Sequence, residues 1–265
     1  MEVLLIVVGL VLLALFGSPL FAIIAAVALI AFSLAGIDTA AVIIELYRIA
    51  ETPTLMAIPL FAFAGYLLAE SNSPKRILGL AEALFGWMPG GLAIVVLSTC
   101  AFFTAFTGAS GITIVALGGL LFPLLLKQGY PQQFSLGLVT ASGSIGLLFP
   151  PSLPIILYGL VAAVSIDQLF VAGIVPGFLL LAVLSVYSVR TGVVAHVPRV
   201  RFSWSNVWSA VKGAAWEIPL PFIIIGGIYG GAFTATEAAA VTAFYVFVVE
   251  VFIYRDLKLF TDVPR

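Results

Sequence analysis

The chain has 265 residues, of which 63% are apolar and only 9% are charged, and its formal net charge is −1. Soluble domains carry about 25% charged residues, so this composition excludes a soluble globular protein and predicts an all-α membrane protein that crosses the lipid bilayer several times. The balanced charge gives no reason to expect nucleic acid as a partner. The single Cys100 excludes an internal disulfide.

The first elements are two short helices. Residues 3–35 are apolar but are interrupted by Gly17-Ser18-Pro19, which predicts two helices joined by a tight turn. Each has about 15–17 residues, at the short end for a membrane span. A mildly polar stretch, 38–51, then leads to a helix over 53–69.

Residues 71–88, SNSPKRILGLAEALFGWM, predict an amphipathic helix that lies along the membrane interface. Ser73 is a favourable N-cap residue, and Pro74 suits the first helical position. One apolar face carries Ile77, Leu80, Ala81, Leu84, Phe85 and Met88 at helical spacing.

Residues 91–126 are apolar, with the polar motif FTGASGIT at their centre. A division at 107–111 gives two arms of about 15 residues, roughly 22 Å each at helical rise. Because the hydrocarbon core is about 30 Å thick, these lengths favour a re-entrant hairpin. Two short complete spans remain an alternative, since both arrangements return the chain to the same side.

The next apolar segment, 134–164, is interrupted by SGSIGLLFPPSLP at 142–154 and is predicted to be a broken helix. A helix over 168–189, an interfacial segment over 203–216 and a final pair of helices over 218–253 follow. This pair resembles the pair in 1–35 but enters the membrane from the opposite side, as inverted repeats do.

Charge asymmetry predicts the orientation, with Met1 outside the cell. Arg48 is then the only cation outside. The cations predicted to lie inside are Lys75, Arg76, Lys127, Arg190, Arg199, Arg201, Lys212, Arg255, Lys258 and Arg265. Four tryptophans, Trp87, Trp204, Trp208 and Trp216, fall at the predicted inner boundary, where aromatic residues concentrate.

The central apolar segments cannot carry acid–base or transition-metal chemistry. Lys127 is the only charged residue between Gly86 and Ile166, so a membrane enzyme is disfavoured. Hydroxyl groups, backbone carbonyls and helix termini remain available. Thr107, Ser110 and Thr113 lie at the predicted hairpin tip, and Thr140, Ser142 and Ser144 lie beside the predicted break.

The prolines at the predicted break indicate which backbone carbonyls lack a hydrogen-bond partner. Pro150 and Pro151 have no N–H, so they cannot pair with the carbonyls of Gly146 and Leu147, four residues earlier. Unpaired carbonyls persist in a membrane only where protein, water or an ion satisfies them, and sodium is a hard cation that prefers oxygen ligands. The helix restarting near Pro150 points its N-terminus into the same space, where a carboxylate could bind. The alternative is a simple kink in a packed helix.

At these residues the sequence resembles the large membrane subunit of tripartite ATP-independent periplasmic (TRAP) transporters of the DctM type. The resemblance covers the whole chain and is most specific in TASGSIGLLFPPSLPIILYG at 140–159. Further matching motifs are IPLFAFAGYLLAES, FTGASGIT with LLFPLLLKQGY, LFVAGIVPGFLLL and FTATEAAAVTAFYVFV.

The resemblance implies a sodium-coupled secondary transporter of the bacterial inner membrane that imports organic acids such as C4-dicarboxylates. It implies two partners, a small four-helix membrane subunit and a periplasmic substrate-binding protein. The fold implied is elevator-type, with inverted repeats, two hairpins and two broken helices. No cofactor is implied other than sodium as the coupling ion.

The family pattern assigns one sodium site to Thr107, Ser110, Gly146, Leu147 and Pro151, with Ser142 and Gly143 as neighbours. Its usual hairpin tip is richer in serine, so Thr107 takes the place of a serine hydroxyl. Ser144, Thr113 and Ser152 are predicted to contact the substrate.

The resemblance also predicts how the chain divides. The segments expected are scaffold helices (1–70), an arm helix (71–90), the hairpin and broken helix of a transport domain (91–165), a connecting helix with an inner loop (166–202) and the start of a second repeat (203–265). The second hairpin and second broken helix of the family are not present. We therefore also expect, as the alternative, a truncated, transport-incompetent fragment or a non-catalytic scaffold.

Three glutamates receive structural interpretations. Thr234 and Glu237 have the spacing of a capping box at the start of the last helix. Glu217 and Glu250 lie near the inner ends of predicted helices and are expected at the membrane interface, with a proton-relay role as the alternative that no sequence feature supports.

Overall fold

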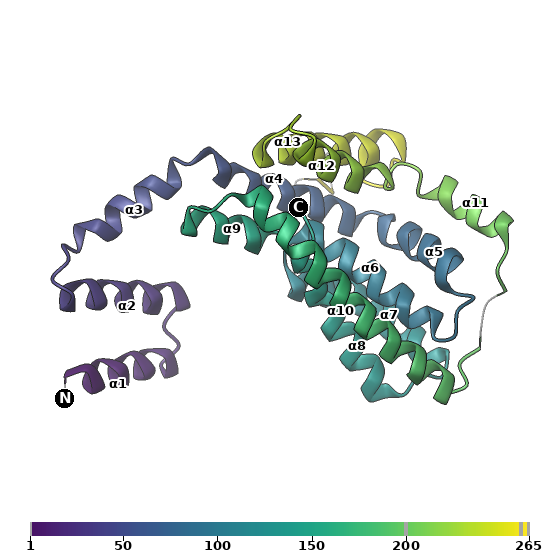
Figure 1. Ribbon diagram of the computed structural model, residues 1–265, viewed down its shortest axis with the longest axis horizontal. Coiled ribbons are helices and arrows are strands. Elements are labelled where there is room, and N and C mark those ends of the chain that lie inside the picture. The colour runs from purple at the N-terminus through teal and green to yellow at the C-terminus, as the bar shows by residue number, and fades with distance from the viewer. Residues whose placement is uncertain (1, 199–200, 260–261, 264–265) are drawn as a thin grey trace. The chain divides into compact units, whose positions relative to one another are not determined.

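A computed structural model describes residues 2–198, 201–259 and 262–263 of the chain (Figure 1). This described part contains thirteen α-helices and no β-strand, which confirms the predicted all-α fold. It divides into two compact units, Met1–Thr52 and Pro53–Arg265. Among the described residues, four segments are long and apolar enough to cross a membrane, namely Pro53–Glu70, Ser110–Lys127, Ile166–Val194 and Ala235–Ile253. A bent helix pair gives a fifth span if the pair is counted as one.

The first unit begins with the predicted pair of short helices, α1 (Glu2–Leu15) and α2 (Leu20–Leu34), which contact each other. Gly17 has φ = +80° in the turn between them, a conformation that glycine adopts readily because it has no Cβ. Phe16 and Phe21 are more than three-quarters exposed. Such side chains require lipid or another protein surface around them.

A third helix of this unit, α3 (Ala40–Ala50), was not predicted. The Asp38 carboxylate accepts the Ala40 N–H at the first turn (2.9 Å), and Arg48 pairs with Glu45 one turn away (2.7 Å). The stretch 38–51 is therefore an amphipathic helix rather than a polar connection.

The second unit is built around α6 (Gly91–Thr107), which is buried along nearly its whole length. It contacts α4 (Ala57–Glu70), α5 (Ser73–Phe85), α7 (Ser110–Lys127), α8 (Gln132–Ile145) and α10 (Ile166–Val194). Figure 1 shows α6, α7, α8 and α10 side by side. Cys100 is fully buried at the centre of α6, as expected for a small core residue.

The predicted broken helix is confirmed, and two helices joined by a tight turn stand where the hairpin was predicted; whether that hairpin is re-entrant stays a prediction. The helices α6 and α7 have 17 and 18 residues, or about 26 Å each at helical rise. These arms are longer than predicted, so length no longer favours a re-entrant hairpin over two spans. The broken helix consists of α8, a short 3₁₀ turn η2 (Gly146–Leu148) and α9 (Leu153–Ala162), with a bend of 44°.

The two predicted interfacial segments are helices that contact each other, α5 and α11 (Trp204–Gly213). Helix α5 begins one residue earlier than predicted: Asn72 occupies the N-cap position, and the Ser73 N–H donates to the Ser71 hydroxyl (3.0 Å). Ile77 and Ala81 of the predicted apolar face are buried. Placement at a membrane surface stays a prediction for both helices.

The last elements are α12 (Pro219–Tyr229) and α13 (Ala235–Val248), which are in contact, followed by a π-helical turn η3 (Val249–Ile253). The capping box is confirmed, because Thr234 and Glu237 accept each other's backbone N–H groups. The predicted inverted relation between this helix pair and α1–α2 stays a prediction. A 3₁₀ turn η1 (Pro53–Met56) precedes α4, which packs along α13.

The contact of α4 with the end of α6 gives a first prediction. A Cβ at Gly65 would lie 2.7 Å from the Thr107 Cα and 2.8 Å from the Phe106 carbonyl oxygen. We expect Gly65→Ala to lower the free energy of unfolding in detergent by about 1–3 kcal/mol, as overpacked cores do. Gly79→Ala is the matched control, because its Cβ meets no atom within 4 Å. This control should gain about 0.5–1 kcal/mol from helix propensity. Equal responses of the two variants would show that α4 does not hold the α6 terminus closely.

Candidate functional site

The hairpin tip and the helix break lie against each other in the second unit. Gly108 has φ = +62° between α6 and α7, and a Cβ there would lie 2.6 Å from the Leu153 Cβ. On the other half of the broken helix, a Cβ at Gly143 would lie 3.3 Å from the Ser110 carbonyl oxygen. We call this region, residues 107–113 with residues 142–153, the junction. The structure thus brings together the two polar interruptions that the sequence predicted.

Two threonine hydroxyls bridge the hairpin tip. The Oγ1 atoms of Thr107 and Thr113 are 3.0 Å apart, and both side chains are buried. The Thr113 hydroxyl also lies 3.4 Å from the Ala109 carbonyl oxygen. Hydroxyl oxygens keep lone pairs when they donate, so this pair both stabilises the tip and offers oxygen ligands.

The break corrects one prediction about the backbone. The Gly146 carbonyl is paired, because it accepts the N–H of Phe149 (3.1 Å). In a 3₁₀ turn, each carbonyl accepts a hydrogen bond from the N–H three residues later. For Gly146 that residue is Phe149, which still has an N–H because it stands directly before the two prolines. The Leu147 carbonyl is different, since Pro150 stands three residues ahead of it and has no N–H. Among the described residues, no hydrogen bond to the Leu147 carbonyl is found.

The break also packs directly on α6. A Cβ at Gly146 would lie 2.5 Å from the Thr104 Cβ and 2.8 Å from the Ala105 nitrogen, so only glycine fits there. The hydroxyls of Thr104 and Ser152 are fully buried and have no hydrogen-bond partner in the described part of the chain. Leaving such groups unpaired costs about 1–3 kcal/mol each. Within the described residues, the break side of the junction therefore holds unsatisfied oxygens, and Thr104 adds one from the turn of α6 just before the junction.

The other predicted residues divide into buried and exposed positions. Pro151 and Ser142 are buried, and the Ser142 hydroxyl donates to the Val139 carbonyl (3.0 Å). Ser144 is exposed and lies outside the buried part of the junction. The helix after the break restarts at Leu153 rather than near Pro150, with Ser152 as its N-cap residue. Thr104 was not predicted, although it lies one turn before Thr107 on the same helix.

The cavity beside the break is apolar. It measures about 250 Å³, and its lining includes Phe102, Phe106, Phe149, Pro150 and Phe178 but no charged residue. A carboxylate would find no compensating charge there.

In the described ranges, no group of three or more His, Cys, Asp or Glu side chains could hold a metal ion.

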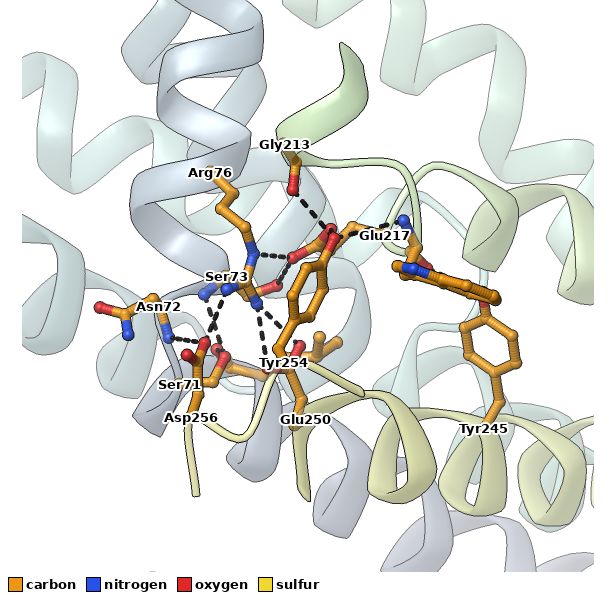
Figure 2. Close-up of polar contacts among 12 residues, drawn as sticks. Ser71, Asn72, Ser73, Arg76, Gly213, Glu217, Tyr245, Glu250, Tyr254 and Asp256 are labelled. Atoms are coloured by element: carbon orange, nitrogen blue, oxygen red, sulfur yellow. Dashed lines mark hydrogen bonds and ion pairs between the residues drawn. The ribbon is translucent and has the colours of Figure 1, made fainter. Parts of the chain in front are cut away.

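A second buried polar cluster was missed by the sequence (Figure 2). Glu217 and Glu250 are fully buried, and both pair with Arg76 of α5, as does Asp256. Placement of these two glutamates at the membrane interface stays a prediction; the structure adds that they are buried inside the protein, which the guanidinium allows. We call these four residues the Arg76 cluster.

Comparison with known families agrees with the resemblance noted in the sequence. A family profile described as "Tripartite ATP-independent periplasmic transporter, DctM component" matches residues 4–263. The match covers nearly the whole chain, including both sides of the junction.

Curated relatives give the same result. The chain is 38% identical over 244 residues to the C4-dicarboxylate TRAP transporter large permease protein DctM of Rhodobacter capsulatus, covering 86% of this chain and 55% of that protein. It is 40% identical over 207 residues to the ectoine TRAP transporter large permease protein TeaC of Halomonas elongata, covering 78% and 48%. It is 41% identical over 208 residues to the isethionate TRAP transporter permease protein DctMQ of Oleidesulfovibrio alaskensis, covering 77% and 32%. The matched part of the chain thus spans about half the length of the Rhodobacter capsulatus and Halomonas elongata proteins.

The threonine bridge at the tip gives a second prediction. Thr113→Val removes one hydroxyl at nearly constant volume and leaves Thr107 without its partner. We expect a loss of about 1–3 kcal/mol in the free energy of unfolding, measured by denaturant titration in detergent. Thr140→Val is the matched control, because its hydroxyl donates to the Leu136 carbonyl (2.8 Å) on an exposed face. If both variants unfold at the same denaturant concentration, the bridge does not stabilise the tip.

Proposed function

Because the chain belongs to the DctM family of TRAP transporter large permeases, we propose that it forms the membrane permease part of a sodium-coupled secondary transporter. In this proposal it imports organic acids into a bacterial cell across the inner membrane. The observation that carries the proposal is the junction, where a hairpin tip meets a broken helix in an uncharged segment. Broken helices at a repeat interface are where secondary transporters bind ions and substrates.

Sodium is the proposed coupling ion because the junction offers neutral oxygens only. In the part of the chain that the structure describes, the Leu147 carbonyl has no partner, and the hydroxyls of Ser152 and of Thr104, one turn before the junction on α6, are buried without one. A hard cation satisfies such atoms. The proposed ligands come from the sequence-predicted set of Thr107, Ser110, Gly146, Leu147 and Pro151, with Ser142 and Gly143 beside them. The Gly146 carbonyl keeps a second lone pair after accepting from Phe149.

The proposed substrate is an organic acid. Relatives are named for C4-dicarboxylates, ectoine and isethionate. The N-terminus of α9 provides backbone N–H groups and a positive dipole end for an anionic group. Ser144, Thr113 and Ser152 are the proposed contacts. Thr113 and Ser152 are buried, which favours a small ion over a larger substrate at these two side chains until the junction opens.

Two partners belong to the proposal, a small four-helix membrane subunit and a periplasmic binding protein that delivers the substrate. Because the chain spans about half the length of the relatives it matches, uptake also depends on the second half of the permease. In such a system the transport domain slides in an elevator motion. A non-catalytic scaffold is the alternative, and it differs in binding no sodium at the junction.

Sodium binding can be measured on the chain itself. We expect NaCl to raise the midpoint of thermal unfolding in detergent above that in choline chloride at equal ionic strength. A ligand that binds only the folded state stabilises it by about 2.7 kcal/mol at hundredfold excess over its Kd. Ser110→Ala and Gly146→Val should reduce or remove this difference.

Ser205→Ala, on the exposed face of α11, is the control and should respond to sodium as the wild type does. Equal midpoints in sodium and choline for the wild-type chain would contradict the sodium site and favour the scaffold. Sodium-dependent uptake by the reconstituted permease with both partners, lost in Ser110→Ala, then tests transport itself.

A further inference from the structure

The Arg76 cluster joins three segments that lie far apart in the sequence. Arg76 is on α5, Glu217 is in the turn before α12, and Glu250 and Asp256 lie in and beyond the π-helical turn η3 (Figure 2). The guanidinium contacts all three carboxylates, with Nε on Glu217, Nη2 on Glu250 (3.0 Å) and Nη1 on Asp256 (2.6 Å). One cation thus holds the interfacial helix to the start of α12 and to the end of α13.

The charges of this cluster do not balance. Three ionised carboxylates around one guanidinium would leave two negative charges uncompensated. Within the described ranges, no other Lys, Arg or His side chain makes an ion pair with these carboxylates. Glu217 and Glu250 are fully buried, and Arg76 is only 15% exposed. An uncompensated charge in such a place is so unfavourable that a carboxyl group takes up a proton instead.

Glu217 has more hydrogen-bond donors around it than either of the other two carboxylates. It accepts hydrogen bonds from the Arg76 Nε and the Ser73 hydroxyl (3.0 Å). The Tyr254 hydroxyl lies 3.0 Å from Glu217 and 2.9 Å from the Gly213 carbonyl oxygen, and its one hydrogen is shared between these two acceptors. Hydrogen bonds to the charged form favour that form. Burial, followed by the negative charge of Glu217, raises the pKa of Tyr254 to about 12, so the phenol keeps its proton and continues to donate.

Asp256 also stays ionised, because it has two donors and some contact with solvent. It accepts from the Arg76 Nη1 and from the Asn72 backbone N–H (3.0 Å), and its side chain is 13% exposed. Burial raises the pKa of Asp256, but hydrogen bonds from Arg76 and Asn72 outweigh burial and lower the pKa overall. Its charge is therefore stabilised without a proton.

Glu250 has the poorest environment for a negative charge. Both of its oxygens share one donor, the Arg76 Nη2, at 3.0 and 3.2 Å. The nearby Ser71 hydroxyl donates instead to the Leu68 carbonyl (3.0 Å). The charged and titratable groups around Glu250 are Arg76 from α5, Glu217 from the turn before α12, and Tyr254 and Asp256 from the segment after η3. Only one of these four, Arg76, is a cation.

We propose that the Arg76 cluster binds one proton, held by the Glu250 carboxyl, and that this proton keeps α5 fastened to the start of α12 and the end of α13. The protonated cluster then consists of a neutral Glu250, a paired Arg76 and Glu217, and a partly solvated Asp256. The π-helical turn that carries Glu250 is a rare element that is frequent at functional sites. The cluster is thus a pH-sensitive contact between α5, the start of α12 and the end of α13, and it is separate from the sodium site proposed at the junction.

The direction of the pH effect follows from where the proton is bound. A glutamate in the unfolded chain is ionised above about pH 4.3, whereas the proposed proton on Glu250 in the folded chain is held to a higher pH. The folded state therefore binds one more proton than the unfolded state, and stability falls as the pH rises. Loss of the proton adds a second uncompensated charge and loosens the three segments.

Infrared spectroscopy on the purified chain tests the proton directly. Near pH 6, we expect the wild type to show the C=O stretch of a buried protonated carboxylic acid, and Glu250→Gln to lack it. Glu82→Gln, an exposed position of α5 outside the cluster, should keep the band. A wild-type spectrum with no protonated carboxyl band at about pH 6 overturns the proposal, and this measurement does not depend on whether any variant folds.

Thermal unfolding gives the second readout. Between about pH 6 and about pH 9, the wild-type midpoint should fall by about 3 °C for each pH unit over which the proton is lost. The Glu250→Gln variant should be as stable as the wild type at about pH 6 and should lack this decline, while Glu82→Gln should show it. A Glu250→Gln variant that folds but is already destabilised at about pH 6 would show that an ionised Glu250 is required, and the proposal would fail.

Discussion

The structure depends on one constraint, which is that backbone polar groups inside a membrane must be paired by the protein itself. The segment from α8 to α9 departs from this rule, because Pro150 and Pro151 remove two N–H donors where helical carbonyls need them. Such a break persists only when it is enclosed. Here α6 encloses it, with Gly146 packed against Thr104 and Ala105, and the hairpin tip covers it through Gly108 and Leu153. The burial of α6 and the position of the tip both follow from the need to shield the break.

The sequence predicted the break well because its causes are local. Proline and glycine act on the backbone within a few residues, so their positions alone located the junction to within a turn. The same reasoning failed at the Gly146 carbonyl, because the chain tightens to a 3₁₀ turn and Phe149 donates to it. Tightening is a usual response of a helix end with unpaired carbonyls. Thr104 was missed for a different reason: its importance comes from packing against Gly146, and no spacing rule reports that contact.

The Arg76 cluster could not be predicted in this way. Its partners are separated from Arg76 by 141, 174 and 180 residues in the sequence, and each group alone fits the interfacial position that was expected. Only the folded chain shows that they converge. In contrast, α3 was predictable in principle, since Glu45, Arg48 and Glu51 recur every three residues along one face.

The two polar sites of the second unit differ in a way that suits different ligands. The junction offers neutral oxygens, which suit the proposed sodium ion because they would hold a cation without a fixed opposite charge and so allow its release. The Arg76 cluster has an excess of carboxylates around a cation that cannot leave, so the exchangeable species there is a proton. Both sites adjoin α6, because α5 packs along this helix and one cavity of about 250 Å³ is lined by both Glu217 and Thr99. If protonation at one site changes how α6 is held, ion binding at the other must change proton affinity by the same factor, since linkage between binding sites is reciprocal.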